Sequence, residues 1–184
     1  MTRATGSARI VVVSRLRLVT LADAPVLAEL QTRHRAFLAP WEPLRAETYS
    51  TVAGQRADVE AALARHERGD AVPFVILDDD GSVAGRITLN GIVHGPFRSC
   101  STGYWLAEDR TGRGLATDAV RAAVTHAFEV LGLHRVQAET LVANVASQRV
   151  LARNGFERYG LAPRYLNIAG SWQDHLMFQR LADA

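Results

Sequence analysis

The segment best suited to bind a charged ligand is a glycine-rich stretch, residues 109–117, which reads DRTGRGLAT. It follows a predicted strand and opens a predicted helix, so backbone N–H groups and the positive end of the helix dipole meet there and can bind phosphate. Glycine allows the ligand to approach the backbone closely, and Arg110 and Arg113 add positive charge beside the loop. The alternative is an ordinary strand-to-helix turn, since G-x-G before a helix is often only that.

The dinucleotide-binding fingerprint does not fit this stretch. That fingerprint, G-x-G-x-x-G, requires a third glycine where Thr117 stands. It also requires an acidic residue about 20 residues further on, at the end of the next strand. The next predicted strand ends near Leu141 to Asn144 without one. The stretch therefore predicts a phosphate site of another kind.

Polar side chains elsewhere are candidates for catalysis. Asn144 and Ser147 lie three residues apart at the start of a predicted helix. They either cap that helix or bring a hydroxyl to a reaction, and one residue can do both. Glu42 stands in a loop directly after Trp41. It is either a solvated carboxylate on a turn, or an acid that binds an incoming ammonium or accepts its proton through water.

Three further reactive residues have competing interpretations. Asp174 and His175 are adjacent near the C-terminal end. They are alternatives to Glu42 as a general base, or they form a hydrogen-bonded pair that fixes a terminal hairpin. Cys100 has no base partner nearby in the sequence and is expected to be a small buried apolar residue rather than a nucleophile.

Composition excludes several classes of protein. All 21 basic side chains are arginine and the 184 residues include no lysine, so a Walker A phosphate loop and a Schiff-base mechanism are impossible. A single cysteine excludes intrachain disulfides and cysteine-rich zinc sites, and the six histidines show no paired ligand spacing. No metal is expected. A net charge of +2 without a block of like charges argues against nucleic-acid binding.

Length and hydropathy place the chain in a broad class. The longest apolar run near the N-terminus is Ile10 to Val13, too short for a signal peptide or a membrane span. A cytoplasmic protein without membrane association is therefore expected. The length fits one domain, predicted at residues 9–184 after a loose tail at residues 1–8.

Hydrophobic periodicity and turn residues predict one α+β domain. Strands are expected at 10–19, 72–77, 83–89, 99–106 and 135–142, with a terminal hairpin pair at 156–181. Helices are expected from Asp23 to Pro40, from Ser50 or Thr51 to Gly69, from the glycine-rich stretch to Gly132, and from Asn144 to Gly155. In the second helix, Val52, Val59 and Leu63 are expected to face inward.

The spacing of Thr111, Gly114 and Ala116 resembles motif A of the GNAT acyltransferases, usually written Q/R-x-x-G-x-G/A, with a threonine in the first place. Further motifs follow in family order: FLAPWEP at 37–43, GYW at 103–105, NxxS at 144–147, NGF at 154–156 and GxWxDH at 170–175. Together they span roughly residues 16 to 181 and are similar to the subfamily containing the ribosomal-protein-alanine N-acetyltransferases. The resemblance implies a mixed, mostly antiparallel central sheet flanked by helices, and acetyl-CoA as co-substrate.

The resemblance also implies roles for individual residues. Expected to bind coenzyme A are Trp105, Leu106, Gly112, Arg113, Gly114, Leu115, Ala116, Thr117, Asn144 and Ser147. Expected to contact the acceptor are Trp41, Glu42, Tyr104, Trp172, Asp174 and His175. Ser147 and Glu42 are the expected catalytic residues. Many GNAT enzymes carry a tyrosine general acid where Leu151 stands here, and the subfamily often has a glutamate at the place of Tyr159.

The implied reaction is acetyl transfer to a primary amine by direct attack on the thioester, with a backbone N–H of the strand before the glycine-rich stretch holding the oxyanion. At pH 7 an α-amine is roughly 10 to 20% neutral, whereas a lysine amine is about 0.04% neutral. A protein N-terminus therefore needs little help with deprotonation and is the expected acceptor for a chain with Tyr159. A small-molecule amine, or acyl-CoA binding without turnover, are the alternatives. A monomer or homodimer is expected.

Overall fold

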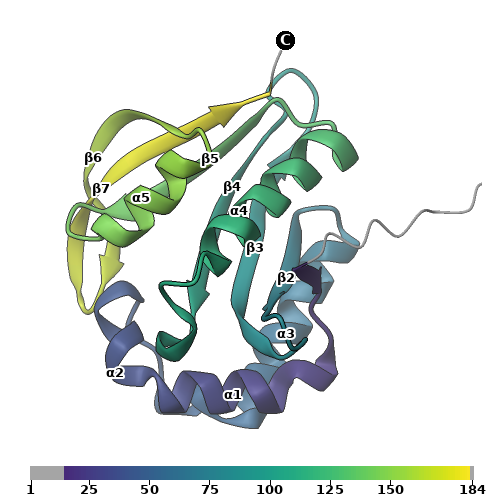
Figure 1. Ribbon diagram of the computed structural model, residues 1–184, viewed down its shortest axis with the longest axis vertical. Helices are drawn as coiled ribbons and strands as arrows, with labels where there is room; N and C mark the ends of the chain where they lie inside the picture. The colour runs from purple at the N-terminus through teal and green to yellow at the C-terminus, as the bar shows by residue number, and fades with distance from the viewer. Residues whose placement is uncertain (1–14, 183–184) are drawn as a thin grey trace, which may run out of the picture.

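In the computed structural model, which describes residues 15–182, seven strands form one mixed sheet of order β1-β2-β3-β4-β5-β7-β6 (Figure 1). The strands are β1 Leu16–Leu18, β2 Ala71–Leu77, β3 Val83–Val93, β4 Ser99–Leu106, β5 Arg135–Leu141, β6 Glu157–Ile168 and β7 Ser171–Leu181. In this part of the chain β4 and β5 pair in parallel and the other neighbours pair antiparallel. The expected α+β class and mostly antiparallel sheet are confirmed.

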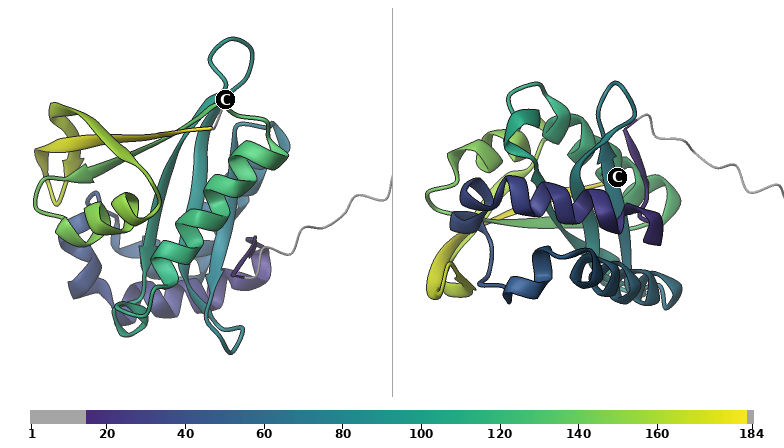
Figure 2. Two further views of the ribbon diagram at one scale, coloured as in Figure 1. Left: turned by 45° about the horizontal axis from the view of Figure 1, so that its top comes forward. Right: turned by 90° about the horizontal axis from the view of Figure 1, so that it is seen from below.

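Helices cover both faces of this sheet (Figure 2). They are α1 Ala24–Arg33, α2 Arg35–Leu38, α3 Val52–Glu67, α4 Leu115–Thr125 and α5 Val145–Arg153. The described chain also has four short 3₁₀ helices, η1 Leu21–Asp23, η2 Ala39–Trp41, η3 Glu47–Ser50 and η4 Glu108–Arg110, and a π-helical turn, η5 His126–Val130. One core cluster joins α4 and α5 to the sheet, with Val120 and Leu151 fully buried. A second cluster joins Leu27 of α1 and Val59 of α3 to Val75 of β2.

The helix after the glycine-rich stretch forms as its periodicity predicts. Buried residues recur every three or four positions along α4, among them Ala119, Ala123 and Val124. The last turn widens into the π-type turn η5, and the helical segment stops before Gly132, whose φ is +63°. This stripe fixes α4 on the sheet, and α4 in turn fixes the glycine-rich stretch at its N-terminus.

Two local predictions are wrong. The helix expected from Asp23 to Pro40 is interrupted at His34, which has φ −106° and ψ 17° and separates α1 from α2. His34 is buried, and the sequence pattern did not indicate a break at this position. Val52 is 51% exposed because it is the first residue of α3, directly after the Thr51 cap, where the chain has not yet reached the core.

Part of the N-terminal prediction lies outside the described residues. Of the strand expected at 10–19, β1 takes up Leu16–Leu18, and residues 10–14 are not described. The loose tail predicted at 1–8 lies outside the described residues as well, so a domain start at residue 9 stays a prediction. Within residues 15–182, no helix is both long and apolar enough to cross a bilayer.

Candidate active site

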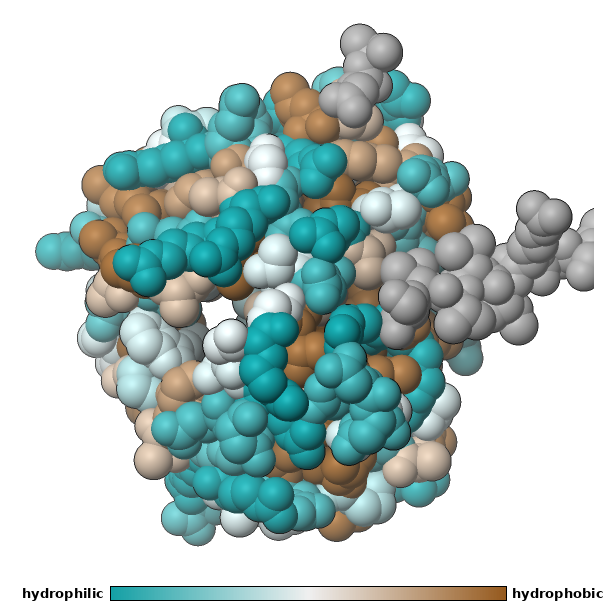
Figure 3. Space-filling view, in the orientation of Figure 1, coloured by the Kyte–Doolittle hydropathy of each residue, from teal (hydrophilic) through white to brown (hydrophobic). Residues whose placement is uncertain are grey.

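The sheet opens between β4 and β5. Their parallel pairing covers three residue pairs in the described structure and ends with Ser101 opposite Gln137. Beyond this pair β4 continues to Leu106 and β5 to Leu141. Each keeps its other neighbour, because β3 stays paired with β4 and β7 with β5. The two halves of the sheet therefore diverge, and Figure 3 shows a narrow opening in the surface at this place.

One side chain from each half meets across this gap. The Tyr104 hydroxyl of β4 and Ser147 Oγ of α5 share a hydrogen bond of 2.8 Å. Burial raises the pKa of Tyr104 to about 12, against a smaller lowering by Ser147, so the phenol stays protonated at neutral pH and can donate a proton. The hydrogen bond places two hydroxyls side by side in the gap, a contact that the sequence did not indicate, and the expected contact of Tyr104 with the acceptor stays a prediction.

The cap of α5 leaves the Ser147 hydroxyl free for this contact. Asn144 Oδ1 accepts a 3.0 Å hydrogen bond from the Ser147 backbone N–H, so Asn144 is the N-cap as predicted. The two interpretations of Ser147 thus separate by atom. Its backbone N–H takes part in the helix cap, and its side-chain hydroxyl bonds to Tyr104.

The backbone of β4 offers an oxyanion donor at the same gap. The Ala107 N–H, directly after β4, bonds to Ala84 O of β3. Successive N–H groups along a strand point to opposite sides. The Trp105 N–H therefore also points to β3, while the Leu106 N–H points into the gap. The Trp105 side chain packs against the cluster of α1 and α3. Of these two expected coenzyme-binding residues, Leu106 has the amide directed at the site.

The glycine-rich stretch lies at the end of the gap, directly before α4. Gly112 and Gly114 have φ values of +75° and +85°, a region that other residues rarely adopt. Gly114 is the N-cap of α4, and the Asp118 N–H is bonded to Gly114 O. The N–H groups at the head of a helix precede its first intrahelical hydrogen bonds, so those of Leu115 and Ala116 are available to a ligand. We call residues Gly112–Thr117 the cradle. Its backbone N–H groups are suited to bind a pyrophosphate.

The two arginines beside the cradle are engaged in ion pairs. Arg113 Nη2 lies 2.6 Å from Asp78 Oδ2, and Arg110 donates to the same carboxylate oxygen. Asp78 follows β2 and is buried. The single carboxylate of Asp78 therefore compensates one of the two positive charges that the sequence predicted beside the loop. Thr111, at the place of the family's Q/R, donates through its hydroxyl to Glu108 O at 2.8 Å.

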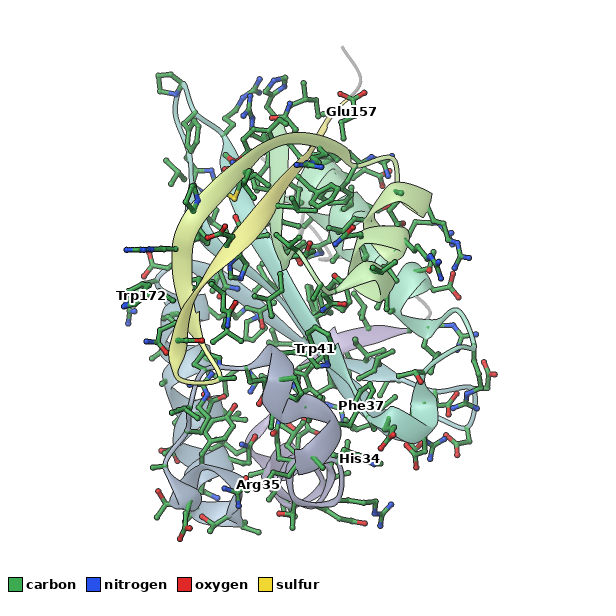
Figure 4. The ribbon with its side chains drawn as sticks, turned by 90° about the vertical axis from the view of Figure 1, so that its left-hand side faces the viewer. His34, Arg35, Phe37, Trp41, Glu157 and Trp172 are labelled. Carbon is green, nitrogen blue, oxygen red and sulfur yellow. The ribbon has the colours of Figure 1, made fainter. Side chains whose placement is uncertain are left out.

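The loop after α2 and the tip of the β6–β7 hairpin close the other side of the gap. The Ala169 N–H bonds to Glu42 O at 3.0 Å, and a Cβ on Gly170 would lie 3.0 Å from the Leu44 side chain. Trp41 is 39% exposed and is the last residue of η2, near the centre of the molecule in Figure 4, whereas Trp172 lies on the outer side of the hairpin. The two tryptophans expected at the acceptor are thus not brought together.

Glu42 is not a freely solvated carboxylate. Its side chain is half-buried. Burial raises the pKa of Glu42, opposed by smaller effects of the nearby Gln31 amide and Arg45. A carboxyl group with a raised pKa binds protons more readily, which suits a group that accepts a proton during a reaction.

The other two base candidates are tied into the terminal hairpin. Asp174 Oδ1 accepts a 2.8 Å hydrogen bond from the Arg164 N–H, and His175 Nδ1 lies 3.0 Å from Gln173 O. The His175 ring also contacts Tyr165, with 5.5 Å between ring centroids. The two side chains are not bonded to each other, but each fixes the hairpin through its own partner, in line with the structural alternative weighed from the sequence.

Glu139 is a carboxylate that the sequence analysis missed. It lies on β5 beyond the last pair with β4, and burial raises its pKa. The strand pattern alone gave no signal for Glu139, because a neighbour on the same face of β5, Gln137, is polar as well. Cys100, by contrast, is 2% exposed, and burial raises the pKa of its thiol to about 12, which agrees with the predicted apolar role.

No group of three or more histidine, cysteine or acidic residues within 15–182 is placed to hold a metal ion. The polar groups at the gap are instead amides, hydroxyls and a carboxylate. This set suits binding of a phosphate-bearing thioester and transfer of its acyl group.

Comparisons with known proteins agree with this geometry. Residues 14–157 match the family described as Acetyltransferase (GNAT) domain. The chain is 35% identical over 163 residues to the [Ribosomal protein uS5]-alanine N-acetyltransferase of Escherichia coli (strain K12), covering 88% of this chain and 84% of that protein. It is 34% identical over 161 residues to the probable N-acetyltransferase YjcK of Bacillus subtilis, covering 87% and 89%.

Solved structures give the same result. Mycobacterium smegmatis RimJ in complex with CoA-disulfide superposes with a TM-score of 0.88 at 35% identity, covering 91% of this chain and 81% of that one. RimL, a ribosomal L7/L12 alpha-N-protein acetyltransferase in complex with coenzyme A, superposes with a TM-score of 0.83 at 27% identity, covering 93% and 96%.

Proposed function

The chain belongs to the GNAT acetyltransferase family and is an acetyl-CoA-dependent N-acetyltransferase, and we propose that its acceptor is the α-amine of a protein N-terminus. The observation that carries this proposal is Tyr159 at the place where the subfamily often has a glutamate. Its hydroxyl accepts a 2.7 Å hydrogen bond from Gln137, so it serves the sheet rather than proton transfer. Without a glutamate at this place, the enzyme has one candidate general base fewer than such members of the subfamily. This suits an α-amine, because part of it is already neutral at pH 7.

Acetyl-CoA supplies an activated acetyl group on a thioester, and the protein orients it. In the proposed mechanism the Gly112–Thr117 cradle binds the pyrophosphate through backbone amides. Asn144 and Ser147 border the arm that carries the thioester. The Leu106 N–H donates to the carbonyl oxygen as negative charge develops on it. Trp41 and Glu42 approach from the acceptor side.

Proton transfer divides between the two sides of the gap. As the amine nitrogen bonds to the carbonyl carbon, Glu42 accepts the released proton through water. As the carbon–sulfur bond breaks, the Ser147 hydroxyl donates a proton to the thiolate and Tyr104 returns one to Ser147; water then carries the proton held by Glu42 back to Tyr104. The pKa of about 12 keeps Tyr104 in the donor form throughout the neutral range.

A paired-acceptor assay tests the proposed substrate. Peptides with a free N-terminus and no lysine are compared with N-blocked peptides of the same sequence carrying one lysine, and thiol release is measured. We expect kcat/KM to be a few hundredfold higher for the free N-terminus, in proportion to the neutral fractions of the two amines. Turnover of the lysine peptides alone contradicts the proposal. A polyamine or amino acid that outperforms all peptides moves the acceptor to small molecules.

The role of Glu42 predicts a specific pH dependence. Below the pKa of the acceptor amine, log kcat/KM falls with a slope of one. Below the raised pKa of Glu42 the base is also protonated, so the slope steepens to two. In Glu42→Gln we expect a slope of one throughout and a kcat/KM about tenfold lower at neutral pH, since direct deprotonation contributes little for a partly neutral amine. Glu47→Gln, an exposed acid five residues on, is the matched control and keeps the wild-type profile.

A further inference from the structure

Asp78 lies outside the proposed reaction path but contacts the segment that binds acetyl-CoA. It occupies the turn between β2 and β3, which is closed by hydrogen bonds from the Asp78 N–H to Ser82 O at 2.9 Å and from the Gly81 N–H to Asp78 O at 3.0 Å. Its side chain is only 4% exposed. A carboxylate this buried needs partners, because an uncompensated buried charge is costly.

Its partners are the two arginines of the glycine-rich stretch. Arg110 and Arg113 both donate to Asp78 Oδ2, the latter at 2.6 Å. Asp78 Oδ1 accepts from the Asp79 N–H at 2.8 Å, which holds the carboxylate plane toward the loop. One side chain on the β2–β3 turn thus bonds to two points of a loop that lies 32 and 35 residues further along the chain.

Thr111 is bonded to Glu108 O, but residues 112–114 of the loop have little else to fix their shape. Residues 111–114 are all exposed. A Cβ on Gly112 or Gly114 would meet none of the described atoms within 4 Å, so no packing confines these two residues. Glycine is the most flexible residue when unconfined. Arg113, between the two glycines, therefore depends on its bond to Asp78 for a fixed position.

We propose that Asp78 is a positioning residue that holds the glycine-rich loop in its phosphate-binding shape through Arg110 and Arg113, and that these guanidinium groups bind Asp78 rather than the phosphates. This inference rests on the proposed role of the Gly112–Thr117 cradle. It assigns phosphate recognition to backbone amides and loop rigidity to a buried carboxylate.

The surrounding charges agree with that division. Arg15 lies 2.7 Å from Asp79 and 3.5 Å from Asp118 of α4, and Arg121 lies 2.8 Å from Asp118. Arg110 Nε also lies 3.7 Å from Asp109 Oδ1. With Asp78 and its arginines, the network around the loop therefore sets four aspartates against four arginines. The hydrogen bonds from Asp79 and from the arginines lower the pKa of Asp78 to about 2, so the carboxylate is ionised at neutral pH. Its stabilisation of the folded loop is present above about pH 4 and is lost as the pH falls toward 2.

The test is the KM for acetyl-CoA in Asp78→Asn, measured with the full chain at a saturating peptide acceptor. Loss of charge-assisted hydrogen bonds to both arginines should raise this KM about tenfold, equivalent to about 1.4 kcal/mol, while kcat stays within about threefold. Asp79→Asn is the matched control, since Asp79 is the neighbouring acid, is 80% exposed and bonds to Arg15 instead. We expect its KM to remain at the wild-type value.

The sign of the effect separates the two roles of the arginines. If Arg110 and Arg113 bound phosphate directly, releasing them from Asp78 would lower the KM, and that result, or an unchanged KM, overturns the proposal. Arg113→Gln should raise the KM to a similar extent, and the double variant should show no further rise. If Asp78→Asn is too unstable to assay, Asp78→Glu replaces it, with an expected rise of about threefold because the charge is kept but displaced. Failure of the cradle itself appears separately, as an unchanged KM in Gly114→Val.

Discussion

Ser147→Ala should lower kcat about 100-fold while its KM for acetyl-CoA changes by less than about threefold. General acid catalysis contributes about 10²- to 10⁴-fold, and the lower end applies because a thiolate of ordinary pKa near 8.5 is a weak base. The fold should be unaffected, since the cap of α5 uses the Ser147 backbone N–H and Asn144 Oδ1, which alanine preserves. Steady-state thiol release and a melting curve measure both effects.

Tyr104→Phe gives the matching result if the two hydroxyls act as one relay. Because Tyr104 and Ser147 share one hydrogen bond, we expect the single variants and the double variant to lose similar factors in kcat. Asn144→Ala is the structural control. It removes the cap at a cost of about 1 kcal/mol in the free energy of unfolding but keeps the Ser147 hydroxyl. Full kcat in Ser147→Ala would restrict Ser147 to helix capping and remove it from the reaction.

Gly114→Val should raise the KM for acetyl-CoA by about 30- to 150-fold. The φ of +85° at Gly114 is strained for a β-branched residue, at a cost of roughly 2–3 kcal/mol, and relaxation of that strain would turn the amides of the cradle away from the pyrophosphate. Steric overlap is not the cause, since a Cβ there would meet none of the described atoms within 4 Å. Calorimetry with coenzyme A measures the effect directly.

A glycine of the same backbone class controls for general destabilisation. Gly69 follows α3 with φ +79° and equally open surroundings among the described residues. Gly69→Val should lower the melting temperature while affinity for coenzyme A stays at the wild-type value. Equal loss of affinity in both variants would mean that the Gly114 effect is a loss of folding, and the cradle assignment would fail.

The sequence by itself determined the features that depend on neighbouring residues. Asn144 caps α5 because its side chain reaches an N–H three residues on. The apolar stripe of α4 and the glycines before it placed the helix and its N-terminal loop correctly, since helical period and positive φ are local properties. The motif spacing was sufficient to indicate the family for the same reason.

Tertiary structure decided everything that depends on where strands diverge and turns meet. Parallel pairing of β4 with β5 ends at Ser101, and that divergence is what allows Tyr104 to reach Ser147, 43 residues away. No local pattern encodes how far two strands stay paired. Likewise, the loss of solvent that raises the pKa of Glu42, and the ion pairs that engage Arg110 and Arg113, arise from segments folding onto one another. The sequence therefore indicated which residues are candidates for chemistry, whereas burial and long-range contacts determined which of them lie together.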